Sequence, residues 1–109
     1  MIDSNTGQTE TYTFGDIIVD EYMRMVWREG NEVNLTPKEY ELLVALARRR
    51  GAPASKQALM SEVWNSSVET QSRTLDQHVF ELRRKLERTR REPRHLITVR
   101  KYGYRLRCD

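Results

Sequence analysis

Residues 73–86, RTLDQHVFELRRKL, place four apolar side chains on one narrow stripe of a helix. At about 100° of rotation per residue, the spacing i, i+4, i+7, i+11 brings the members of the stripe to a single face. They are Leu75, Val79, Leu82 and Leu86. A stripe this regular must be buried against a core, so it fixes the orientation of the helix and decides which of its side chains point outward.

The outward face of this helix differs from an ordinary solvated face. A solvated face usually carries long Glu and Lys side chains in i, i+4 pairs, and this pattern is interrupted here by Thr74, Gln77 and Phe80. Arginine, threonine and glutamine are side chains that reach base edges and phosphates in a major groove. We therefore interpret the face as a contact surface. It consists of Arg73, Thr74, Gln77, Phe80, Glu81 and Arg84, flanked by Asp76, His78, Arg83 and Lys85.

The charges are divided unevenly along the chain. Residues 1–72 carry 7 Lys/Arg and 11 Asp/Glu, whereas residues 73–109 carry 12 Lys/Arg and 5 Asp/Glu, which together give the net charge of +3. A basic third on an otherwise acidic domain favours a face that meets a polyanion. A highly charged surface without a partner is the alternative, and charge alone does not separate the two.

Size and composition are typical of one soluble folded domain, with 109 residues of which 38% are hydrophobic and 32% charged. The single cysteine, Cys108, cannot form an internal disulfide, which favours a reducing cytoplasm. The longest apolar run, residues 42–47, is too short to span a bilayer. We find no nucleophile–base pair, phosphate-cradling glycine loop or metal-ligand set, so the chain is expected to be no enzyme and to need no cofactor.

The first third of the chain predicts a small antiparallel sheet. Residues 1–11 are polar without an apolar period and are interpreted as the remnant of a flexible linker. Residues 12–20 and 23–29 alternate around β-branched and aromatic side chains, and a turn at 29–32 leads into 32–35. This pattern indicates a strand meander.

Helix start signals follow. TPKE at 36–39 combines a capping threonine, a proline at the first helical position and a glutamate that completes a capping box. Three arginines at 48–50 suit the negative end of that helix, with a nucleic-acid contact as the alternative. Ser55 is predicted to cap a second helix. A polar connector at 65–72 then leads to the third helix, at about residues 73–87.

The last predicted element is a basic β-hairpin at about residues 97–107 with Lys101 and Tyr102 near its tip. Arg100, Lys101, Arg105 and Arg107 lie on or beside it. Such a hairpin can grip a nucleic-acid backbone or insert a side chain into a minor groove. An ordinary surface hairpin whose tyrosines pack on the core is the alternative, and Tyr104 is expected to pack.

Four motifs in this order carry a family resemblance, namely LTPKEYELL, SEVW, RTLDQHVFELRRKL and ITVRKYGYRL. Together they resemble the winged-helix output domain of OmpR/PhoB-type response regulators over about residues 13–107. The resemblance implies an α+β winged helix-turn-helix over residues 12–108, with a four-stranded N-terminal antiparallel sheet, three helices and a C-terminal hairpin wing. It also implies sequence-specific binding to double-stranded promoter DNA and a role in transcription regulation within a two-component system.

The resemblance also implies roles for individual residues of the third helix and the wing. Arg73 and Thr74 would contact the DNA backbone, Gln77, Glu81 and Arg84 would face the major groove, Arg83 would reach a phosphate, and Arg100 would enter the minor groove. His78 is interpreted as packing and positioning, with a phosphate contact as the alternative. Phe80 and Glu81 lie at variable groove-side positions: Phe80 would meet a thymine methyl or fold inward, and Glu81 would accept from cytosine or repel phosphate. At the wing tip, Lys101 and Tyr102 replace the glycine common in relatives.

Further partners follow from the same resemblance. A loop that contacts RNA polymerase in activators of the family matches Trp64, Asn65, Ser66, Ser67, Val68 and Glu69. Family members usually carry a receiver domain before the output domain, so we expect one in the full-length protein. We further expect binding to tandem half-sites, with weak or no dimerisation of the isolated domain. The competing hypothesis is a winged helix that binds another protein, anchored by Phe80 and Trp64.

Overall fold

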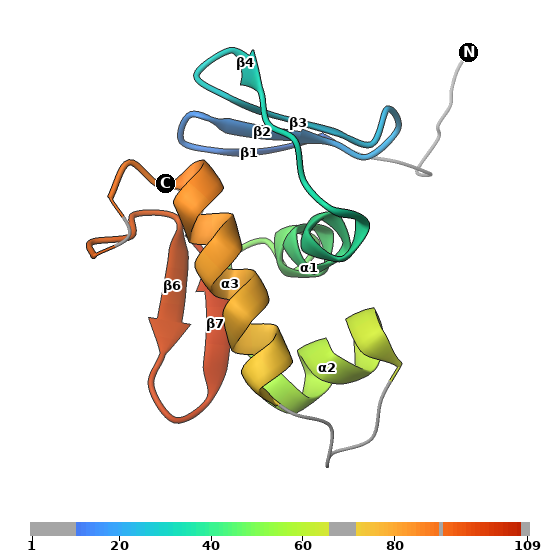
Figure 1. The fold of residues 1–109 in the computed structure, drawn as a ribbon, viewed down its shortest axis with the longest axis vertical. Helices are drawn as coiled ribbons and strands as arrows, with labels where there is room; N and C mark the ends of the chain where they lie inside the picture. Colours follow the sequence, from blue (N-terminus) through green and yellow to red (C-terminus); the bar gives the residue numbers. More distant parts are fainter. Residues whose placement is uncertain (1–10, 66–71, 90, 108–109) are drawn as a thin grey trace.

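The first described residues form a four-stranded antiparallel sheet in simple meander order (Figure 1). Its strands are β1 (Thr11–Phe14), β2 (Ile17–Asp20), β3 (Met25–Arg28) and β4 (Asn31–Glu32). The coordinates are a computed structural model that describes residues 11–65, 72–89 and 91–107. The predicted linker therefore lies outside the described residues, apart from Thr11, which is the first residue of β1.

Turn chemistry sets the strand boundaries of this sheet. Segment 12–20 is divided into two strands because Gly15, at φ 60, reverses the chain. Glu29 and Gly30 both have positive φ, as the tight hairpin between β3 and β4 requires. The prediction of a strand at 32–35 was wrong in extent. Only Asn31–Glu32 pair with β3, and after one more bond, from the Val33 N–H to the Val26 carbonyl, the chain leaves the sheet to begin a helix.

Three helices follow: α1 (Pro37–Ala47), α2 (Lys56–Trp64) and α3 (Ser72–Leu86). The capping box of α1 is present, since Thr36 Oγ1 accepts from the Glu39 N–H at 3.2 Å and Glu39 Oε1 accepts from the Thr36 N–H at 3.0 Å. Ser55 caps α2 by accepting from the Ala58 N–H at 3.0 Å. Both caps confirm the helix starts predicted from sequence.

The arginines after α1 serve the protein's own structure. Arg49 donates to the carbonyl of Ala45 in the last turn of α1 at 2.9 Å and forms an ion pair with Glu62 of α2. Arg48 pairs with Glu21, and the Arg50 guanidinium lies 5.1 Å from the centre of the Tyr12 ring. The contact of Arg49 fits the helix-end interpretation, whereas Arg48 and Arg50 contact residues of the N-terminal sheet and its turn.

The apolar stripe of α3 enters the core as predicted. Each of its four members, Leu75, Val79, Leu82 and Leu86, is at most 1% exposed. The stripe meets α1, whose Leu42, Leu43 and Leu46 are fully buried. Within the described residues no helix combines the length and the apolar character that a membrane crossing requires.

The C-terminal hairpin belongs to a second, three-stranded sheet. Its strands β6 (Leu96–Val99) and β7 (Gly103–Leu106) pair antiparallel, and β7 also pairs with β5 (Ala54–Ser55), the short strand before α2. The sequence did not predict β5. Gly103 makes the pairing possible, because a Cβ at this position would lie 2.0 Å from the Ala54 carbonyl oxygen.

This geometry predicts that Gly103→Ala severely destabilises the domain. The added methyl group meets a backbone carbonyl that cannot move without breaking the β5–β7 pairing, so we expect a loss of about 3 kcal/mol or more, in the range of severe point mutations. Chemical denaturation measures it. The matched variant Gly30→Ala has φ +84 but open space around the new methyl group, and should lose only about 1 kcal/mol from backbone strain. Equal losses for the two variants would contradict the steric argument.

Candidate nucleic-acid interface

The outward face of α3 is oriented as the helical wheel predicted. Four of its side chains, Arg73, Gln77, Phe80 and Arg84, are exposed at the spacing i, i+4, i+7, i+11. Thr74 and Glu81 are half-buried at the margins of this face. The buried stripe and the exposed face thus divide the helix into two opposite sides.

The flanking residues of α3 bind other elements of the fold, starting with Asp76 near its N-terminal end. Asp76 Oδ1 accepts from the Tyr104 hydroxyl of β7 at 2.6 Å, and the Lys56 ammonium of α2 lies 3.3 Å from the same carboxylate. Burial raises the pKa of Tyr104, and the bond to Asp76 raises it further, so the phenol remains a donor. This cluster joins the beginning of α3 to the wing.

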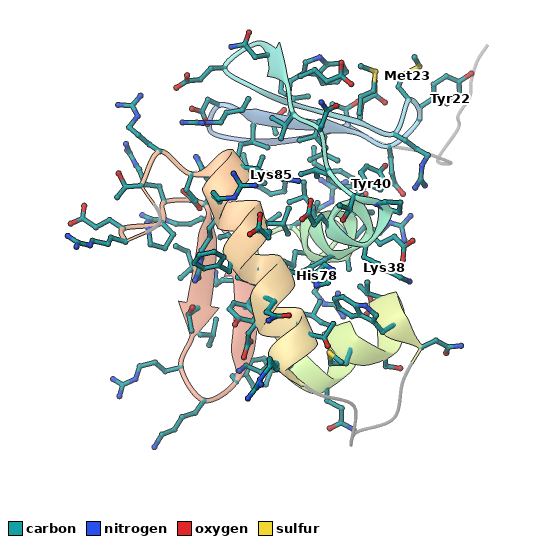
Figure 2. The ribbon with its side chains drawn as sticks, viewed as in Figure 1. Tyr22, Met23, Lys38, Tyr40, His78 and Lys85 are labelled. Carbon is teal, nitrogen blue, oxygen red and sulfur yellow. The ribbon has the colours of Figure 1, made fainter. Side chains whose placement is uncertain are left out.

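His78 is held on the side of α3 that faces α1 and α2 (Figure 2). Its Nδ1 lies 2.8 Å from the carbonyl oxygen of Thr74, and its ring meets the Trp64 ring edge-on at 4.9 Å between centres. Trp64 itself packs against the core. These contacts favour packing and positioning over a phosphate contact for His78.

Arg83 connects α3 to the first strand of the wing. Its Nε donates to the Leu96 carbonyl at 3.0 Å and its Nη2 donates to Thr98 Oγ1 at 2.8 Å. The guanidinium also lies 5.8 Å from the centre of the Tyr104 ring. Two of its donor nitrogens are thus engaged inside the domain, which gives Arg83 a positioning role beside the predicted phosphate contact.

Glu87, which sequence reasoning missed, organises the turn between α3 and the wing. It is only 4% exposed, and its carboxylate accepts three backbone N–H groups, from Arg94 at 2.8 Å, His95 at 2.9 Å and Leu96 at 2.7 Å. A carboxylate at the negative end of a helix is unfavourable for the helix dipole. That unfavourable placement is the sequence signal that could have singled out Glu87.

Lys85 connects α3 to the start of α1. Its ammonium lies 2.7 Å from Glu39 Oε1, and both side chains are largely buried. Burial alone would raise the pKa of Glu39. The bonds from Lys85 and from the Thr36 N–H, together with the positive charge of Lys85, outweigh burial and lower that pKa below its ordinary value of 4.5.

The wing tip is a turn of exposed side chains at Arg100, Lys101 and Tyr102. Lys101 adopts a left-handed backbone conformation with φ 59, which explains why a glycine would suit this position. The Tyr102 side chain is 51% exposed, while its backbone carbonyl accepts from the Lys56 N–H at 3.1 Å. Tyr104 is buried, as predicted.

Two predicted contact residues on α3 are paired with each other. Arg84 and Glu81, three positions apart, form an ion pair at 2.9 Å. Arg84 is the more exposed of the two. The Glu81 carboxylate therefore has a partner on its own helix.

The predicted polymerase loop is described only at its beginning. Trp64 is half-buried, and Asn65 is exposed and ends α2 in a left-handed conformation with φ 54. Ser66, Ser67, Val68 and Glu69 lie outside the described residues.

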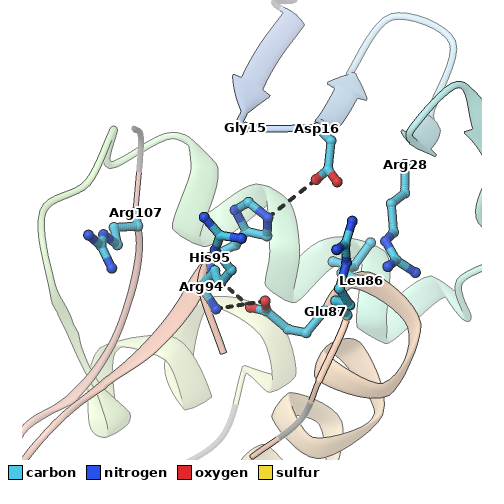
Figure 3. Close-up of a pocket in the computed structure, with 9 residues that line it drawn as sticks. Gly15, Asp16, Arg28, Leu86, Glu87, Arg94, His95 and Arg107 are labelled. Carbon is cyan, nitrogen blue, oxygen red and sulfur yellow. Dashed lines mark hydrogen bonds and ion pairs between the residues drawn. The ribbon is translucent and has the colours of Figure 1, made fainter. Parts of the chain in front are cut away.

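A hollow of about 330 Å³ lies beside the C-terminal end of α3 (Figure 3), whereas the wing tip lies near the beginning of that helix (Figure 1). It is lined by the β1–β2 turn, the end of α3 and the base of the wing, and His95 Nε2 lies 3.3 Å from Asp16 Oδ1 across it. The Arg28 Nε and His95 Nδ1 atoms there have no hydrogen-bond partner among the described residues. None of the residues predicted to contact DNA lines this hollow.

Comparison with known proteins gives concordant matches over most of the chain. The family model "Transcriptional regulatory protein, C terminal" matches residues 30–106. The chain is 35% identical over 96 residues to the DNA-binding response regulator MtrA of Mycolicibacterium smegmatis, covering 88% of this chain and 42% of that protein. It is 41% identical over 93 residues to the transcriptional regulatory protein SrrA of Staphylococcus aureus, covering 84% and 39%. The chain thus spans less than half the length of these curated relatives.

A solved structure gives the same fold. The DNA-binding domain of RstA from Klebsiella pneumoniae, in complex with the RstA box, superposes with a TM-score of 0.84 at 28% identity. The match covers 92% of this chain and 99% of that one. The winged helix-turn-helix architecture expected from the sequence is thereby confirmed.

The position of Glu87 predicts that Glu87→Gln loosens the wing. An amide in place of the carboxylate offers fewer acceptor sites and turns a donor group toward three N–H groups, so we expect a loss of about 1–3 kcal/mol in the free energy of unfolding. Hydrogen exchange should accelerate at the amides of Arg94, His95 and Leu96. The matched variant Glu92→Gln, at an exposed carboxylate of the same turn, should change neither quantity. Unaltered exchange in Glu87→Gln would contradict the anchoring role.

The lowered pKa of Glu39 predicts a specific acid dependence of stability. Because this pKa is lower in the folded than in the unfolded chain, ionised Glu39 stabilises the fold above its ordinary pKa. That stability is lost as the pH falls from about 4.5 through the lowered pKa. Glu39→Gln should therefore flatten the acid limb of a melting-temperature profile between pH 7 and pH 3. Glu41→Gln, which leaves the Glu39–Lys85 pair intact, should retain the wild-type limb, and identical profiles for both variants would refute the assignment.

Proposed function

The chain belongs to the transcriptional regulatory protein C-terminal family, the output domains of OmpR/PhoB-type response regulators, and on that premise we propose that it binds double-stranded DNA sequence-specifically and regulates transcription. The observation that carries the proposal is the orientation of α3. Its buried stripe leaves Arg73, Gln77 and Arg84 exposed. A helix of about 10–12 Å diameter fits a major groove about 12 Å wide.

The wing supports the same proposal, because its tip and the beginning of α3 lie at the same end of the molecule (Figure 1). The Asp76–Tyr104 bond at 2.6 Å and the two bonds of Arg83 to β6 hold the wing against the helix. Exposed Arg100 and Lys101 at the tip offer positive charge to the backbone or minor groove beside the major groove that α3 enters.

We assign roles within this surface mainly according to exposure, so Arg84, the more exposed member of its ion pair with Glu81, keeps a groove-facing role. Gln77 and Arg84 face the groove and read bases, while Arg73 and Thr74 meet the backbone at the start of α3. Arg100 enters the minor groove, with Lys101 and Tyr102 beside it. Arg83 and His78, whose polar groups are engaged within the domain, act mainly by positioning the helix.

The wider assembly is part of the proposal. The curated relatives are more than twice as long as the matched region, which agrees with a receiver domain in a full-length cytoplasmic protein of a two-component system. The domain would occupy one of two tandem half-sites, with weak or no dimerisation by itself. RNA polymerase would meet the loop that begins at Trp64 and Asn65.

A protein-interaction module is the second candidate, and the exposed ring of Phe80 is the observation that favours it. Its other expected anchor, Trp64, packs against the core and against His78. Binding to a protein partner that survives nuclease and high salt, with no shift of any DNA, would favour this candidate over DNA binding.

DNA binding by this surface should depend strongly on salt. Each neutralised phosphate contributes about −0.9 to the slope of log affinity against log salt, and the arginines of α3 and the wing supply several such contacts. Fluorescence anisotropy with labelled duplexes across a salt series measures the slope. A flat response would rule out the proposed function.

Single variants should separate base reading from general binding. Gln77→Ala and Arg84→Ala should alter sequence preference and cost about 1–3 kcal/mol on the preferred site. Arg83→Ala should weaken binding to all sequences by a similar factor, because the wing loses its tie to α3. Arg88→Ala provides a matched control. This arginine is also exposed, but it pairs with Glu29 between β3 and β4 and is not part of the proposed DNA-contact surface. Equal losses on preferred and random DNA for Gln77→Ala and Arg84→Ala, or a loss confined to the preferred site for Arg83→Ala, would contradict the assigned roles.

A further inference from the structure

We propose that Phe80 and Gln77 together read A·T base pairs at neighbouring positions of the DNA site, with the Phe80 ring on a thymine methyl group and the Gln77 amide on an adenine edge. This inference rests on the proposed function and specifies the sequence preference of the same surface. Two interpretations of Phe80 were open from the sequence, contact with a thymine methyl or folding into the interior.

The exposed fraction of Phe80 decides between these two interpretations. The Phe80 side chain is 49% exposed, whereas its neighbour Val79 on the apolar stripe is 1% exposed. Among the described residues, Phe80 is the one large hydrophobic side chain of α3 that is exposed. The ring therefore lies on the outward face, between Gln77 and Arg84, and not in the core.

A hollow of about 440 Å³ runs from the outward face toward the start of α1, lined by Phe80, Gln77 and Glu81 together with His78 and Glu39. The charged groups along its border already have partners, since Glu39 binds Lys85 and Glu81 binds Arg84. The third polar group, the His78 ring, lies against the Thr74 carbonyl. The side-chain amide of Gln77 makes no hydrogen bond to another residue in the described part of the chain. The hollow thus offers a ligand mainly an aromatic ring and an amide.

These two groups match one kind of base pair. In the major groove, the C5-methyl group of thymine is the apolar feature, and adenine presents the N7 acceptor and N6 donor that a glutamine amide binds in a bidentate manner. Residues three apart on a helix have Cβ atoms about 5–6 Å apart, and successive bases rise about 3.4 Å. The two side chains therefore reach the same or adjacent base pairs.

The ion pair between Glu81 and Arg84 disfavours the competing preference for a C·G pair. A glutamate reads cytosine by accepting from its amino group, and the Glu81 carboxylate accepts from Arg84 instead, at 2.9 Å. The pair also offsets the negative charge that would otherwise repel phosphates near Phe80.

The experiment begins by selecting the preferred duplex from a random DNA pool with the wild-type domain. Each thymine of that duplex is then replaced singly by deoxyuridine, which lacks only the methyl group, and affinities are measured for the wild type, Phe80→Ala and Phe80→Leu. We expect one position at which loss of the methyl weakens wild-type binding about four-fold, which corresponds to ~0.8 kcal/mol for one buried carbon group. Phe80→Ala should lose this discrimination and Phe80→Leu should retain part of it. Thermal denaturation should show that both variants fold, because the side chain is exposed.

A second arm tests Gln77 independently. Replacing the adenine nearest that position by 7-deazaadenine removes the N7 acceptor, and this should weaken the wild type but not Gln77→Ala. A preferred site without thymine, a flat deoxyuridine series, or the same loss in Phe80→Ala as in the wild type would overturn the inference while leaving DNA binding established. If selection returns no preferred sequence, the proposed function fails and this inference fails with it.

Discussion

The buried carboxylate of Glu87 is the interaction on which the geometry of the contact surface depends. By accepting three successive backbone N–H groups from Arg94 to Leu96, it fixes the point at which the chain leaves α3 and enters the wing. Arg83, one turn earlier, holds the same strand through the Leu96 carbonyl and Thr98. A surface that reads two grooves of DNA at once needs a fixed separation between helix and wing. Here that separation is set by Arg83 of α3 and by Glu87, the residue that follows the helix.

Apart from Glu81, which pairs with Arg84 on the same helix, the charged residues of α3 fall into two groups with different tasks. Arg73 and Arg84 are exposed, while Asp76, Arg83 and Lys85 each bind a different element, namely β7, β6 and α1. From the number of basic residues alone, every positively charged side chain of α3 would be expected to contact DNA. The contacts show that the flanks of the helix join it to three other elements, and these contacts fix the direction in which its exposed stripe points.

Local signals in the sequence were sufficient for the helices and for the orientation of α3. A capping box acts over four residues, and an apolar stripe acts along one helix, so Thr36, Ser55 and Leu75 could be interpreted without knowledge of the fold. What could not be predicted depends on segments far apart in the sequence. β5 was missed because two residues carry no periodicity. The partners of Arg83 and Glu87 were missed because they lie on β6 or in the turn just before it, whose position relative to α3 only the folded chain defines. The exposed residues of the contact surface were predicted from the wheel, and their individual roles toward DNA remain predictions.

The pairing of β5 with β7 has a consequence for how the protein is made. Ala54 and Ser55 emerge from the ribosome long before Tyr104 and Gly103, their partners in the second sheet. Pairing across a loop of that length costs more conformational entropy than forming a helix or a hairpin, whose contacts are local. The N-terminal meander and α1 involve residues that are synthesised earlier, whereas the wing gains its third strand only after Gly103 and Tyr104 have been added. A chain that has its helices but not the β5–β7 pairing would still lack the complete surface proposed to bind DNA, so competence to bind a promoter would depend on a contact between distant parts of the sequence.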